Sequence, residues 1–228
     1  MHVPASSTAL WIADDVALLL QDASTGRCVV SPQERRACLG AAVLLDLILG
    51  GSLRLAGTAM IPTGERGEGA ADVRPAAHAL VLGSLSRRAL TPRRAIQMHG
   101  GRAARLVLER LVADGHLALR AGASSWFATE RRWYPLHDRA ARVRDRFGDA
   151  LAAGQPADHA TGALLAVVNG AGLVPVILGA RSPASAQAAC DVEEAVFRGS
   201  GLGPDVAAVR VALAAEIERA TVGRLPIL

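Results

Sequence analysis

The chain has 228 residues, of which 51% are hydrophobic and 3% aromatic, so it can bury a substantial core and is not intrinsically disordered. All 25 basic residues are arginines, and the lack of lysine excludes P-loop nucleotide hydrolases, protein kinases and Schiff-base enzymes. The net charge of +4 is unevenly spread, because residues 87–146 hold 14 arginines against 5 acidic residues. This segment favours an anionic partner, either nucleic acid or a phospholipid surface, although arginines on solvated helix faces would give the same count.

The cysteines and the N-terminus indicate a cellular compartment. Cys28, Cys38 and Cys190 are odd in number and form no C-x-x-C pair, which argues against a disulfide framework or a zinc site. The first eight residues lack the pattern of a signal peptide. The most apolar stretch, residues 163–180, is interrupted by glycines and a proline, so it does not match a membrane-spanning helix. We therefore expect a cytoplasmic protein.

Most of the predicted elements are helices. An apolar run covers residues 10–21 and ends in a turn cluster. The best-specified helix follows: Ser31 is the predicted N-cap, Pro32 suits the first helical position, and Glu34 completes a capping box. Apolar residues then recur at helical spacing until two consecutive glycines end the helix after residue 49.

Glycines and prolines divide the rest of the chain into shorter elements. A helix opened by Thr91 and Pro92 is expected to break at Gly100–Gly101, and a second one to cover 103–113. The other predicted elements are strands at 52–55, 116–120 and 126–129, a turn-rich loop at 56–77, and helices at 80–90, 139–152, 160–169, 190–199 and 204–222. Together they predict a mainly α protein, a single helical domain over residues 1–228 with short β-hairpins.

No catalytic or metal-binding constellation emerges from the motifs. The six histidines show no ligand spacing such as H-E-x-x-H, and no G-x-S-x-G elbow occurs. The glycine-rich segment 199–203 follows a helix rather than a strand, which excludes a dinucleotide site. We therefore expect a non-enzymatic protein with no catalytic residue, no metal and no cofactor.

One segment predicts a binding mode on physical grounds alone. A helix over 103–113, followed by a basic two-stranded hairpin, matches the arrangement of winged-helix DNA-binding proteins. The arginines that would contact phosphates in this arrangement are Arg102, Arg105, Arg131 and Arg132. The polar residues placed to read bases are Gln97, Arg102 and Arg105. Nucleic-acid binding is therefore the alternative to the main hypothesis, which is given below.

Several segments, taken in order, carry a family resemblance over nearly the whole chain. They are LLLQD at 18–22, LGAAVLLDLILGGSLRL at 39–55, PTG at 62–64, RLVLERLVADGHL at 105–117, YP at 134–135 and TGALLAVVNGAGL at 161–173. Their order and spacing resemble the Golgi phosphoprotein 3 family, which has bacterial as well as eukaryotic members. The resemblance implies a mostly helical domain with a protruding β-hairpin. It also implies peripheral membrane attachment through phosphatidylinositol 4-phosphate.

The resemblance also points to site residues, although the pattern is altered. In the eukaryotic members a tryptophan, a helix arginine and two further arginines hold the head group. These four positions fall on Ser31, Gly40, Gly101 and Ala104. Arg102 and Arg105 keep the paired spacing one residue further along, and Arg36 lies one turn before the helix arginine position. We therefore predict a lipid head-group site formed by Arg36, Arg102 and Arg105.

The main hypothesis is a non-enzymatic peripheral membrane or adaptor protein at the inner face of the membrane. It would bind anionic phospholipid head groups, phosphatidylinositol 4-phosphate-like by the resemblance, because arginine pairs well with phosphate oxygens. Trp11, Trp126 and Trp133 are candidates for insertion into lipid, although we expect them to pack in the protein. An interaction scaffold for protein partners is a third possibility. The sequence predicts no oligomeric state.

Overall fold

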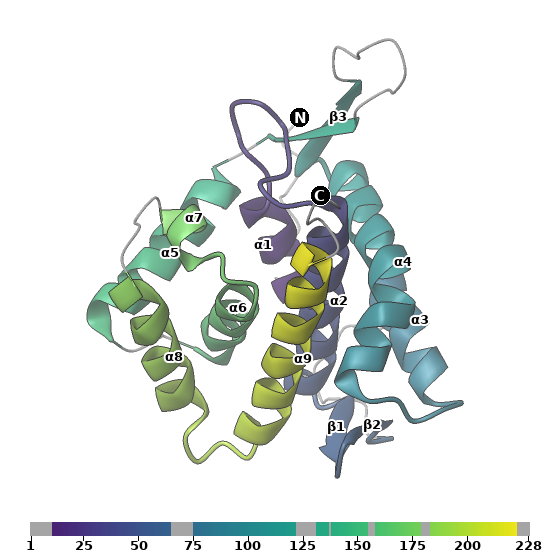
Figure 1. The fold of residues 1–228 in the computed structure, drawn as a ribbon. Helices are drawn as coiled ribbons and strands as arrows, with labels where there is room; N and C mark the ends of the chain where they lie inside the picture. Colours follow the sequence, from purple (N-terminus) through teal and green to yellow (C-terminus); the bar gives the residue numbers. More distant parts are fainter. Residues whose placement is uncertain are drawn as a thin grey trace, which may run out of the picture.

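The computed structural model describes residues 11–64, 75–121, 131–136, 138–154, 158–178 and 183–222, and they form a mainly α architecture (Figure 1). In these residues the helices are α1 (Ile12–Leu19), α2 (Pro32–Leu49), α3 (Ala76–Leu85), α4 (Pro92–Ala113), α5 (Arg139–Ala153), α6 (His159–Gly170), α7 (Val174–Leu178), α8 (Pro183–Phe197) and α9 (Gly203–Val222). The strands are β1 (Leu53–Ala56), β2 (Ala59–Pro62), β3 (Leu117–Ala121) and β4 (Arg131–Pro135). The predicted fold class is confirmed.

Helix α2 lies at the centre of the fold, and its start is fixed by local chemistry. The Glu34 N–H donates to Ser31 Oγ at 3.2 Å, and the Ser31 N–H donates to the Glu34 carboxylate at 2.7 Å. The predicted capping box is therefore present, with Pro32 at the first helical position. All residues from 37 to 48 are buried, because α1, α3, α4, α6 and α9 pack around the helix. A helix surrounded on all sides needs this almost wholly apolar sequence.

Helix α4 corrects one prediction, because it runs unbroken through Gly100 and Gly101. A Cβ added to Gly40 would lie 2.9 Å from the Gly100 Cα atom, and one added to Gly100 would lie 2.5 Å from the Arg36 carbonyl oxygen. Helices α2 and α4 therefore cross more closely than any larger side chain allows. The contact offsets the helix-propensity cost of about 1 kcal/mol for each glycine. The prediction was wrong because glycine serves packing here.

Two hairpins lie at opposite ends of the molecule (Figure 1). Strands β1 and β2 pair antiparallel at one end, and β2 was missed because its residues lie in the stretch that predicts a turn-rich loop. Strands β3 and β4 pair antiparallel at the other end, where Leu117 faces Pro135. The predicted strand at 126–129 lies outside the described residues, and the strand that pairs with β3 is β4.

A buried carboxylate ties α2 to the start of α1. Asp46 of α2 accepts hydrogen bonds from the backbone N–H groups of Ile12 at 2.7 Å and Ala13 at 3.1 Å. It also lies 3.0 Å from Nε2 of the buried His78, whose ring packs on Trp11 at a centroid distance of 4.5 Å. Asp46 thus caps the N-terminus of α1 and holds the buried His78 through Nε2.

Two further buried aspartates join α1 to α4 and α5. Asp14 pairs with Arg110 of α4, and Asp15 accepts from Arg139 at 3.2 Å and from Arg146 at 2.7 Å, both on α5. Burial raises the pKa of Asp14 to about 6, although Arg110 and Arg139 oppose this by favouring its charged form. These arginines therefore serve structure and are not part of an exposed cationic surface.

Candidate anion-binding site

The arginines predicted to bind a lipid head group lie on neighbouring helices beside the α2–α4 crossing. Arg36 is exposed, and its side chain extends over α4, with Cδ and Nε 3.6 and 3.9 Å from the position of a Cβ added to Gly101. Arg105 lies one helical turn after Gly101 and therefore on the same face of α4. The structure thus brings Arg36 and Arg105 to one exposed face.

Arg102 and Arg105 are both exposed, with different surroundings. Arg102 lies about 100° around the helix from Gly101, so it flanks the face that Arg36 covers. Arg105 Nε lies 3.6 Å from Glu109 Oε1, and these side chains are 63% and 61% exposed. An exposed pair of this spacing contributes only about 0.3–0.5 kcal/mol, so Arg105 can exchange it for a phosphate. We call the surface formed by Arg36, Arg102 and Arg105 the basic patch.

A cavity of about 480 Å³ lies beside the same end of α2, and the sequence analysis did not find it. It is lined by Arg27, Cys28, Val30, Pro32, Arg35, Arg131 and Trp133. Three of these lining residues are arginines and none carries a carboxylate, so we call the cavity the arginine–tryptophan pocket. One sequence signal was available: Arg131 and Trp133 are two apart on a strand and therefore face the same side.

The pocket presents one preoriented guanidinium. The Arg35 Cζ atom lies 4.6 Å from the centroid of the Trp133 ring, a cation–π contact. Its Nε atom is buried and has no hydrogen-bond partner among the described residues. Burial raises the pKa of the Cys28 thiol, which Arg35 partly opposes. The thiol therefore stays protonated at neutral pH and is not an activated nucleophile.

Contacts between the loop before α2 and strand β4 form the wall of this pocket. The Trp133 N–H donates to the Gly26 carbonyl at 2.9 Å. Gly26 has a φ of +65°, and a Cβ added there would lie 2.6 Å from the Tyr134 ring. Asp22 accepts hydrogen bonds from Ser24 and Thr25, which lower the pKa of its carboxyl to about 2. The loop is thus internally bonded and anchored to β4.

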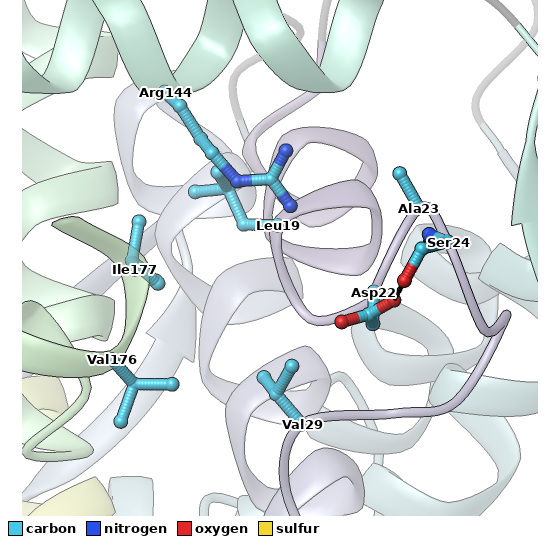
Figure 2. Close-up of a pocket in the computed structure, with 8 residues that line it drawn as sticks. All are labelled: Leu19, Asp22, Ala23, Ser24, Val29, Arg144, Val176 and Ile177. Carbon is cyan, nitrogen blue, oxygen red and sulfur yellow. Dashed lines mark hydrogen bonds between the residues drawn. The ribbon is translucent and has the colours of Figure 1, made fainter. Parts of the chain in front are cut away.

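A second cavity of about 350 Å³ uses the beginning of the same loop (Figure 2). Figure 2 shows the Arg144 side chain, from α5, reaching in from one side, while Val176 and Ile177 of α7 lie opposite the loop. Arg144 donates to the Gln21 carbonyl at 3.2 Å. Because Asp22 lines this cavity and keeps its negative charge, the cavity suits an anion less well than the arginine–tryptophan pocket.

Two further findings concern metal binding and membrane insertion. The described residues contain no group of three or more histidine, cysteine or acidic side chains that could hold a metal ion. Within the same part of the chain, no helix is long and apolar enough to cross a membrane. Trp11 packs on His78 and Trp133 packs under Arg35, so neither projects as a membrane wedge, and Trp126 lies outside the described residues.

The fold and the site define a class: a mainly helical protein with a projecting hairpin and exposed arginines on helices α2 and α4. The N-terminal end of α2 and the C-terminal end of α4 both lie at the β3–β4 end of the molecule (Figure 1). A family model, Golgi phosphoprotein 3 (GPP34), matches residues 12–218. The chain therefore belongs to the Golgi phosphoprotein 3 family, which confirms the resemblance. No curated protein sequence matches it. Family membership is consistent with a non-enzymatic adaptor role.

Proposed function

We propose that the protein is a non-enzymatic adaptor that attaches peripherally to membranes by binding anionic phospholipid head groups at the basic patch. The observation that carries this proposal is the placement of Arg36 and Arg105 on one exposed face at the α2–α4 crossing, with Arg102 beside them. Guanidinium groups remain charged and pair with phosphate oxygens. Each arginine near an anionic leaflet contributes about 1 kcal/mol, so the patch supports weak, reversible recruitment.

The proposed selectivity is for acidic head groups in general. The helix arginine that the family resemblance implies falls at Gly40, where even a Cβ would lie 2.9 Å from the Gly100 Cα atom. An arginine cannot be accommodated there without separating α2 from α4. The chain therefore lacks one of the residues that the resemblance implies for specific recognition of phosphatidylinositol 4-phosphate. Arg36, one turn earlier, supplies charge to the same region with a different geometry.

The nucleic-acid alternative has less support. Gln97, a candidate for reading bases, donates to Glu216 of α9 at 2.8 Å, and Arg93 donates to the same carboxylate at 2.7 Å. The first turns of α4 are therefore engaged with α9, although a recognition helix needs its N-terminal side chains free for base edges. Arg102 and Arg105, further along α4, are exposed and are left for contacts with an anionic surface.

Vesicle flotation tests the proposal with a charge-matched control. Double substitution of Arg102 and Arg105 by alanine should weaken binding to phosphatidylglycerol-containing vesicles by about tenfold or more, because two surface charges are lost. The matched control replaces Arg87 and Arg88, two exposed arginines after α3, and should bind like the wild type. The proposal would be refuted if the wild type bound neutral phosphatidylcholine vesicles as well as anionic ones at low salt. It would also be refuted if both double variants lost the same amount of binding to anionic vesicles.

A further inference from the structure

The arginine–tryptophan pocket differs from the basic patch in shape and chemistry. It is a cavity whose walls include the apolar side chains of Val30, Pro32 and Trp133 as well as three arginines. Glu34, an acidic residue at this end of α2, is not among its lining residues and accepts from the Ser31 N–H at 2.7 Å. The pocket therefore suits an anionic group that arrives on a partly apolar chain.

A strand edge borders this pocket. Because the Trp133 N–H donates to Gly26, the main chain of Trp133 faces away from β3. Hydrogen-bonding groups alternate in direction along a strand, so the N–H and C=O of Arg131 face the same outer edge. No hydrogen bond to this edge at Arg131 is formed by the residues that the structure describes. An edge of this kind is a template for the addition of another strand.

We propose that the arginine–tryptophan pocket and the outer edge of β4 bind an extended acidic peptide of a partner protein. A carboxylate of the peptide pairs with Arg35 and Arg131, and its main chain adds to the edge at Arg131. Arg35 is prepared for this contact, since its guanidinium is held against Trp133 and its Nε lacks a partner in the described structure. The fork of an arginine matches a planar carboxylate.

The strand edge is what favours a peptide over a lipid. A lipid head group could use the guanidinium groups, but it has no main chain to pair with Arg131. The proposal rests on the adaptor role and names the chemistry of the protein partner. It concerns residues outside the basic patch, so the two proposals can fail separately.

A synthetic peptide of alternating valine and glutamate, labelled with fluorescein, is the probe. It is titrated with the full-length protein, and binding is followed by fluorescence anisotropy. The test variant is Arg131→Glu, at an exposed position on β4. The charge-matched control is Arg88→Glu, which is also exposed and lies near Leu90, the residue that bridges to Met60 of β2 at the opposite end. Circular dichroism verifies that both variants are folded.

We expect saturable binding that Arg131→Glu weakens by about tenfold or more and Arg88→Glu by less than about twofold. A peptide with glutamine in place of glutamate, and one with a methylated main chain, should both bind at least about tenfold more weakly. Equal weakening by the two variants would overturn the proposal. So would undiminished binding of either modified peptide, because the first would exclude charge recognition and the second strand addition.

Flotation of the same variants separates the peptide from the membrane. If Arg131→Glu abolishes flotation while binding the probe like the wild type, the pocket is a membrane contact and the peptide proposal fails. The Arg102 and Arg105 double variant should bind the probe normally. A wild-type protein that binds the probe but never floats refutes membrane attachment and leaves the peptide site standing.

Discussion

Among single residues, the buried Asp14 links the stability of the protein to pH. Its carboxyl lies between Arg110 and Arg139, yet burial raises its pKa from 3.8 to about 6. Between about pH 4 and pH 6 the folded protein keeps this proton while the unfolded chain has lost it. The contribution of Asp14 to stability is therefore fully present below about pH 4 and falls as the pH rises through about 6.

Asp14→Asn removes this titration. The unfolding free energies of the wild type and the variant are measured by urea denaturation at several pH values. Between about pH 4 and pH 7 the wild type should lose on the order of 2 kcal/mol more than the variant does. Asp22→Asn is the control, because hydrogen bonds from Ser24 and Thr25 lower the pKa of Asp22 to about 2. The contribution of Asp22 is lost only below about pH 4. The difference in unfolding free energy between Asp22→Asn and the wild type should therefore stay constant between about pH 4 and pH 7. A constant difference for Asp14→Asn would contradict the prediction.

Among the elements, the α2–α4 crossing depends on which glycine faces the partner helix. Gly100 points into α2, where a Cβ would lie 2.5 Å from the Arg36 carbonyl oxygen. Gly101, one residue later, points to the surface, where a Cβ would meet Arg36 Cδ at an ordinary 3.6 Å. Both glycines carry the same helix-propensity cost, so a comparison of the two isolates packing.

Gly100→Ala should therefore destabilise the protein by about 1–3 kcal/mol, because the helices must separate. Gly101→Ala should be neutral or stabilising by up to about 1 kcal/mol, since it gains helix propensity without a clash. Chemical denaturation measures both. Similar values for the two variants would mean that the crossing is more tolerant than its geometry implies.

The loop before α2 offers a second matched pair at the scale of elements. Gly26 and Gly57 share a left-handed backbone, with φ of +65° and +63°. A Cβ at Gly26 would lie 2.6 Å from the Tyr134 ring, whereas one at Gly57 would meet nothing within 4 Å. Both alanine variants lose about 1 kcal/mol to backbone strain, and Gly26→Ala should lose more because the loop must leave β4. Only Gly26→Ala should weaken binding of the acidic probe, measured by anisotropy.

Across the whole molecule, buried ion pairs join segments that are far apart in the sequence. Arg139 of α5 contacts Asp15 at 3.2 Å and Asp14 at 4.0 Å, and its side chain is 13% exposed. Arg139→Leu leaves these two buried carboxylates undercompensated and should cost about 3–5 kcal/mol. Arg142→Leu, at an exposed position on the same helix, should change the unfolding free energy by less than about 0.5 kcal/mol. A comparable loss in both would show that the network is not responsible.

Features determined by short stretches of sequence could be predicted, and features determined by distant contacts could not. The start of α2 follows from Ser31, Pro32 and Glu34, which are neighbours in the chain. Strand β2 was missed because its residues lie in a stretch that predicts a turn-rich loop, and the bridge from Met60 to the distant Leu90 has no local signal. The residues of the basic patch were predicted from the family resemblance, with spacing and charge as a guide, and their role in binding stays a prediction. The arginine–tryptophan pocket could not be predicted, because its segments are distant in the sequence and meet through tertiary contacts such as the Trp133 hydrogen bond to Gly26 and the Arg35 contact with Trp133.

Arg35 and Arg36 are consecutive residues, yet they serve different faces of α2. One lines the pocket against β4 and the other lies over Gly101 of α4. A partner that is itself anchored in the bilayer and carries an acidic tail would engage both faces at once. Its second contact would form at a high effective concentration, so avidity would exceed either affinity alone. Two adjacent side chains would then let the protein respond to a charged bilayer only where an acidic partner is present as well.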